Sequence, residues 1–189
     1  FKSPLQDAVR EAQRAEQRAK RALERGGLGR GAVAVPLMKR SGETIDWGCR
    51  WEGGGLEAAA GMLGAIRQQA LSTKFPHRIV ELVTGYAPEA PGSTGIRESD
   101  PAFEECASEI LRREVGTAVA RQRGRQPSEA QAREVQASIN AYLDGMVDGT
   151  GKRLDARVRV RALIGLCQTV AFLARNVSGV DRLPPGSDA

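Results

Sequence analysis

The sequence of 189 residues has a single histidine, His77, and three widely spaced cysteines, Cys49, Cys106 and Cys167. A Ser–His–Asp mechanism would have to use His77, which lies beside Pro76 in a segment that the pattern predicts as a loop. No Ser or Cys stands in a recognisable nucleophile elbow. The four residues also lack the short paired spacing of structural zinc sites. The sequence therefore favours a non-enzymatic protein with no metal and no cofactor, and we expect its cysteines to be reduced thiols.

Long apolar runs are also missing. No run reaches the length of about 18 residues that a membrane-spanning helix needs, and the first residues lack the basic, apolar and small-residue regions of a signal peptide. We therefore expect a cytoplasmic protein without a membrane partner. Because the chain starts at Phe1 and not at Met, we also expect it to be a trimmed or processed product.

Two glycine-rich segments do not match the pattern of phosphate-binding loops. Residues 149–152 (GTGK) resemble the end of a nucleotide-binding loop, but Met146 stands where the first glycine is required and Arg153 where a Ser or Thr would hold magnesium. Residues 27–31 run from a helix to a strand, the reverse of the order that places a phosphate at a helix N-terminus. We interpret the second segment as a flexible joint and expect no nucleotide cofactor.

Positive charge is plentiful and unevenly placed. The formal net charge is +5, with 28 Lys and Arg against 23 Asp and Glu. Residues 1–40 and 151–189 carry the whole excess, while residues 41–150 are net negative. Arg outnumbers Lys 23 to 5, and the planar guanidinium is the better phosphate ligand because it donates two hydrogen bonds at once. A genome rich in G and C, which favours Arg, Ala and Gly codons together, is the alternative explanation of the arginine excess.

The first element is a predicted helix over residues 4–25. Apolar residues, mostly alanine, fall on one side at helical spacing: Leu5, Ala8, Ala12, Ala15, Ala19, Ala22 and Leu23. Arginines fall on the other side: Arg10, Arg14, Arg18, Arg21 and Arg25. Because an alanine face buries little area, we expect this helix to pack against a partner or a flat surface.

A small α+β unit follows. Alternating apolar residues predict a β-hairpin over residues 32–52 with its turn at Ser41 and Gly42, and Pro36 places the first strand at an edge. A helix is predicted over residues 56–74, and a third strand over residues 78–84 (RIVELVT).

Three helices are predicted beyond a Pro- and Gly-rich segment, over residues 101–123, 128–147 and 152–177, and their short connections favour an antiparallel three-helix bundle. In the last helix Arg153, Arg157 and Arg161 recur every four residues along one face. Arg159 would point to the apolar side, so either the helix starts later, with residues 157–161 as an edge strand, or a buried acid engages Arg159. Glu114 also falls on an inner face, which predicts a salt bridge to an arginine of a neighbouring helix.

The predicted fold class is therefore α+β, mainly α. The predicted organisation is an N-terminal basic helix (1–27), a small α+β unit (28–86), a linker (87–100), the helical bundle (101–178) and a flexible tail (179–189).

Two functions fit these patterns. The favoured one is non-enzymatic binding of a nucleic-acid backbone, DNA or RNA, by one component of a larger bacterial or phage assembly. The candidate residues are the two arginine rows, namely Arg10, Arg14, Arg18, Arg21, Arg25, Arg153, Arg157 and Arg161. Trp47 and Trp51, predicted on one face of the hairpin, are a candidate platform for stacked bases or a simple cover of a small sheet. The alternative function is a protein–protein adaptor or structural subunit, or a homo-oligomer, that docks through its alanine-faced N-terminal helix.

Overall fold

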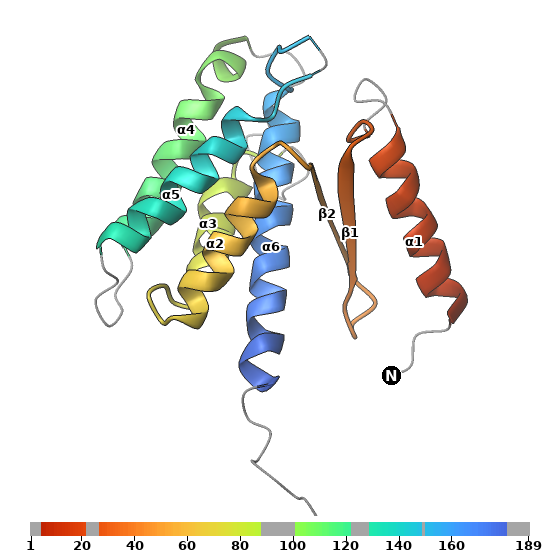
Figure 1. Cartoon of the computed structure of the whole chain (residues 1–189). Helices are drawn as coiled ribbons and strands as arrows, with labels where there is room; N and C mark the ends of the chain where they lie inside the picture. The colour runs from red at the N-terminus through yellow and green to blue at the C-terminus, as the bar shows by residue number, and fades with distance from the viewer. Residues whose placement is uncertain (1–4, 22–26, 88–100, 122–128, 149, 181–189) are drawn as a thin grey trace, which may run out of the picture.

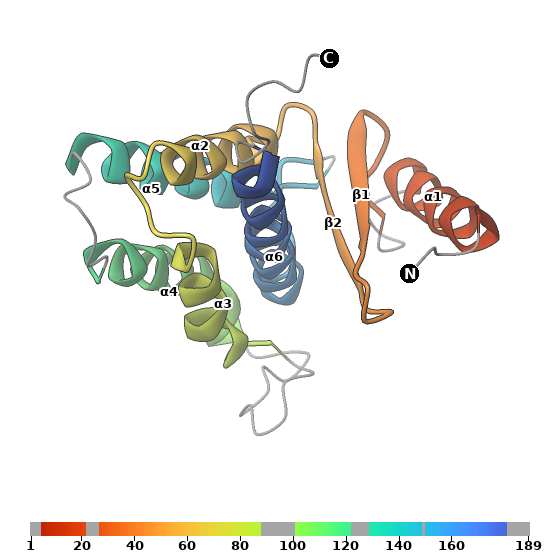
Figure 2. The ribbon, with the colours of Figure 1, turned by 90° about the horizontal axis from the view of Figure 1, so that it is seen from below.

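Helix α6 (Ala156–Val180) lies in the middle of the fold, and the other elements are arranged around it (Figures 1 and 2). The structure is a computed structural model that describes residues 5–21, 27–87, 101–121, 129–148 and 150–180. Within these residues it contains six helices and one two-stranded antiparallel sheet. The predicted class, α+β and mainly α, is confirmed.

The hairpin consists of β1 (Ala32–Met38) and β2 (Thr44–Arg50), as the alternation predicts. Their register pairs Val35 with Trp47 and Pro36 with Asp46. The inner residues of β2 are buried against α6, and α6 approaches the strand closely because Gly165 has no side chain: a Cβ atom there would lie 2.9 Å from the backbone oxygen of Asp46. Helix α6 thus covers β2.

Helix α1 (Leu5–Lys20) packs on β1 from the side opposite α6, so the hairpin is a layer between two helices (Figure 2). Only part of the predicted alanine face is used. Ala15 is buried and Ala19 half-buried, but Leu5, Ala8 and Ala12 are exposed. The buried face of α1 is therefore small, and it packs mainly on β1 of the same chain.

The predicted third strand is wrong, because residues 78–84 belong to helix α3 (Phe75–Thr84). Pro76 stands in the first turn, where its missing N–H costs nothing. Phe75, Ile79 and Val83, four residues apart, are all fully buried. The β-branched residues of this segment suggest a strand, but packing against α6 and α4 overrides that local preference.

The remaining helices are α2 (Gly55–Arg67), α4 (Pro101–Ala120) and α5 (Glu129–Asp144). A separate bundle of the last three helices is not confirmed. Helix α5 packs mainly on α2, while α6 packs mainly on α3, β2 and α2. Helices α2 and α3, which lie in sequence between the hairpin and the predicted linker, are therefore two of the helices that surround α6.

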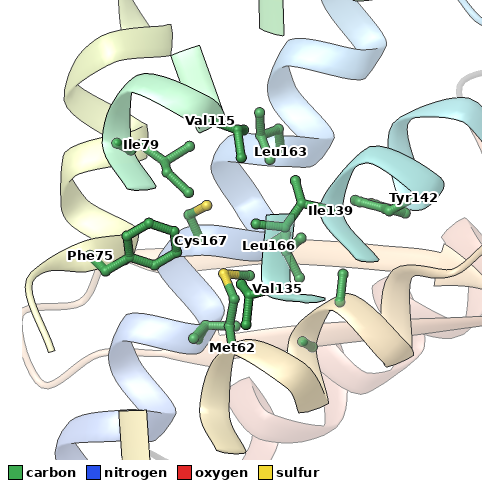
Figure 3. Packing of buried hydrophobic residues seen from close by; sticks show 14 of the residues in the cluster. Met62, Phe75, Ile79, Val115, Val135, Ile139, Tyr142, Leu163, Leu166 and Cys167 are labelled. Atoms are coloured by element: carbon green, nitrogen blue, oxygen red, sulfur yellow. The ribbon is translucent and has the colours of Figure 1, made fainter. Parts of the chain in front are cut away.

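One hydrophobic core runs through both halves of the chain, from Trp47 to Ala174. Figure 3 shows Met62, Phe75 and Ile139 around Cys167 and Leu166 of α6. The proposed division of the chain at residues 27, 86, 100 and 178 stays a prediction; most of the linker and the tail lie outside the described residues. Among the helices that the structure describes, none has the length and apolar character to span a membrane.

Candidate functional site: a groove between α1, β2 and α6

A groove of about 310 Å³ opens where the end of α1, the middle of β2 and the first turns of α6 meet. Its charged lining is Arg18, Asp46 and Arg161. Its apolar lining is Leu28, Trp47, Leu154, Val158 and Ala162, with Gly27 and Gly48 between them. The groove therefore combines two cations and one carboxylate with apolar walls.

The connection after α1 folds back and forms one wall. The amide of Leu28 donates to the carbonyl oxygen of Arg18 at 2.9 Å, and the amide of Gly29 donates to that of Arg21 at 2.9 Å. Leu28 reaches the sheet because Gly48 leaves room for it: a Cβ atom at Gly48 would lie 2.4 Å from Leu28 Cδ1. The last turn of α1 is thereby held next to β2.

Arg18 lines the groove from the last turn of α1. Its Nη1 forms an ion pair with Asp46, and its side chain is 29% exposed. Its Nη2 is buried and has no hydrogen-bond acceptor in the part of the chain that the structure describes. A buried guanidinium nitrogen without an acceptor is costly.

Arg161 reaches the same groove from the other end of the sequence. It lies in the second turn of α6 and is exposed. Arg18 and Arg161 are 143 positions apart, yet both line this groove. The structure thus brings together one arginine from each predicted row.

The other predicted arginines do not join them there. Three are engaged by acids close in sequence: Arg10 by Asp7 at 3.7 Å, Arg14 by Glu11, and Arg157 by Asp155 at 3.4 Å. Arg21 and Arg153 are exposed and do not line the groove, and Arg25 lies outside the described residues. The eight arginines of the two predicted rows therefore do not gather at one site, and several of them form ion pairs with acids.

A buried arginine fixes the start of α6. Arg159 is 1% exposed; it donates to Ser108 and, at 3.3 Å, to the carboxylate of Glu104 on α4. The same carboxylate accepts from the amide of Ala156 at 2.8 and 3.0 Å, which caps the helix. Of the two predicted explanations of Arg159, engagement by an acid is the one that the structure supports, although the Glu104 side chain is 40% exposed and not buried. The helix does begin later than predicted, at Ala156 instead of Lys152, but it includes Arg159. An edge strand over residues 157–161 is wrong.

The two tryptophans do not form a stacking platform. Trp47 is 5% exposed and its indole N–H donates to Tyr142 Oη at 3.2 Å, so it belongs to the core. Trp51 is 56% exposed and lies in the turn beyond the end of β2. The prediction of a stacking pair fails because β2 ends at Arg50, before the alternation reaches Trp51.

In the described part of the GTGK segment, residues 150–152, hydrogen-bond donors of Thr150 and Lys152 are used within the loop. Asp148 Oδ1 accepts from the amide of Thr150 at 2.8 Å, from its hydroxyl at 2.6 Å and from the amide of Lys152 at 3.0 Å. The bonds from Thr150 lower the pKa of Asp148 most strongly. Because a carboxylate already occupies these donors, the described part of the loop is a closed turn and not a phosphate cradle.

The remaining candidates have structural partners. Glu114 accepts from Tyr86 Oη at 3.0 Å, in place of the arginine that the sequence predicts.

His77 Nε2 lies 3.0 Å from Arg175 Nη2, and burial, followed by the charge of Arg175, lowers the pKa of His77. Burial raises the pKa of Cys49 to about 11. Across the described ranges, no group of three or more His, Cys, Asp and Glu residues is placed to hold a metal ion.

Of the residues that line the groove, sequence reasoning identified Arg18, Trp47 and Arg161 as candidates, but it did not predict the groove itself. Asp46, Leu28 and Val158 are separated widely along the chain, and no local pattern connects them. Comparison with protein-family models, with curated proteins and with solved structures finds no match for the chain.

Proposed function

We propose that the protein binds the backbone of a nucleic acid through this groove, without catalysis, as a cytoplasmic component of a larger bacterial or phage assembly. The observation that carries the proposal is that Arg18 and Arg161, from opposite ends of the sequence, line the same groove. Two guanidinium groups beside apolar walls suit a phosphodiester flanked by sugar and base.

Reversing the charge of Arg161 tests the proposal. We expect Arg161→Glu to weaken oligonucleotide binding at low salt by about tenfold or more, because one attraction is lost and a repulsion of about 1 kcal/mol is added at close range. Fluorescence anisotropy of a labelled oligonucleotide measures the effect. Arg161→Gln, which removes the charge without reversing it, should have a smaller effect in the same direction.

Arg113→Glu is the matched control. Arg113 is an exposed arginine of α4, paired with Glu109 at 3.4 Å and absent from the groove. Its reversal changes the net charge of the protein by the same amount as Arg161→Glu. We expect less than a twofold change in affinity. Equal losses in both variants, at equal melting temperatures, would show that only net charge matters and would refute a role for the groove.

A second function is favoured by the exposed side of α1. Leu5 is 79% and Val9 47% exposed, and Ala8 and Ala12 are exposed beside them. Such a stripe is typical of a helix that docks on another subunit. The adaptor function would leave nucleic-acid binding unchanged in Arg161→Glu, whereas Val9→Glu would abolish co-purification with the partner subunit.

A further inference from the structure

We infer that the ligand of the groove is single-stranded nucleic acid, held by few phosphate contacts, and not a duplex. This inference rests on the proposed function and specifies its ligand. It follows from three properties of the groove: its charge, its walls and its size.

The charge is concentrated at two points. Arg18 and Arg161 are the cations that line the groove. Arg10 and Arg14, on the same helix as Arg18, are paired with acids of that helix. A duplex is bound by a broad surface that contacts several phosphates of two strands, whereas this groove offers two guanidinium groups. Two neighbouring phosphates of one strand need no more than the two guanidinium groups present.

The walls favour bases that are not paired. Val158 is 44% exposed at the groove, and Leu28 and Leu154 lie beside it. Single strands offer the faces of their bases to apolar side chains, whereas a duplex buries these faces in its stack. The Asp46 carboxylate, 54% exposed, adds an acceptor for a base N–H group, which is available only where that edge of the base is unpaired. Asp46 also repels phosphate, so we expect a bound strand to turn a base edge, and not a phosphate, toward Asp46.

The size is that of a small ligand. A volume of about 310 Å³ is at the lower end of the range of about 300–1,000 Å³ for small-molecule sites. This volume has room for about one nucleotide unit, which an unpaired base can enter and a base stacked in a duplex cannot.

The test compares a labelled single strand of about 20 nucleotides with the duplex of the same sequence, using the full chain and salt concentrations between about 50 and 200 mM. We expect the single strand to bind at least about tenfold more tightly. The logarithm of its association constant should fall with the logarithm of salt concentration with a slope of about −1.4, since each single-strand contact contributes about −0.7. Arg161→Glu should reduce the slope to about −0.7.

The possible failures are distinct. A duplex that binds as tightly as the single strand, or a slope near the value of about −5.6 that eight single-strand contacts would give, overturns the inference and leaves the proposed function standing. Displacement of the strand by a mononucleotide of equal affinity also overturns the inference, because it assigns the groove to free nucleotides. Absence of binding by both nucleic acids at low salt refutes the proposed function itself.

Discussion

Glu104→Ala is expected to lower the free energy of unfolding by about 3 kcal/mol. The substitution leaves the Arg159 guanidinium, 1% exposed, without its carboxylate, and removes the cap of the Ala156 amide. Breaking a buried ion pair by deleting one partner costs about 3–5 kcal/mol. The lower value applies because 40% of the Glu104 side chain remains exposed to water. Urea unfolding, followed by tryptophan fluorescence, measures the loss; buried Trp47 is the tryptophan whose surroundings change on unfolding.

Two further variants show whether the pair is responsible. Glu105→Ala changes the exposed neighbour of Glu104 and should alter stability by less than about 0.5 kcal/mol. Arg159→Met, introduced into Glu104→Ala, removes the stranded charge and should recover part of the lost stability, since apolar replacements of buried pairs are often neutral. A Glu104→Ala variant as stable as Glu105→Ala would mean that Arg159 does not depend on this carboxylate.

Phe75→Ala is expected to have an effect of similar size, about 3–5 kcal/mol. Phe75 begins α3, is fully buried, and lies beside Cys167 of α6 in the core (Figure 3). Its truncation leaves a cavity between α3 and α6, which pack closely against each other. Arg78→Ala, at an exposed position of the same helix, is the control and should cost less than about 0.5 kcal/mol. Similar unfolding midpoints for the two variants would contradict the observed placement of α3.

Elements with a clear period were predictable from the sequence. The alternation of Ile45, Trp47 and Cys49 identifies β2 and its buried face, and the spacing of Val135, Ile139 and Tyr142 identifies the buried seam of α5. Such patterns are local, because burial of one face repeats at every second residue of a strand and at every third or fourth residue of a helix.

The misjudged features depend on contacts between distant residues. Ile79 and Val83 are four residues apart, a spacing that fits both the two-residue period of a strand and the period of a helix. In a segment of only seven residues, tertiary packing therefore decides that α3 is a helix. The ion pairs of Arg18 with Asp46 and of Arg159 with Glu104 join residues that no local spacing connects. Consequently the sequence identifies the two arginine rows. It does not show which arginines of the rows meet at the groove and which form ion pairs with acids.

The chemical shifts of the arginine side chains during titration with a single-stranded oligonucleotide test the groove most directly. The Nε–Hε signals of Arg18 and Arg161 should move together and saturate at one oligonucleotide concentration, together with the backbone amide of Val158 at the groove wall. The signal of Arg113, which does not line the groove, should stay in place. Shifts confined to Arg10 and Arg14, or a set that omits Arg161, would contradict a groove assembled from the two ends of the chain.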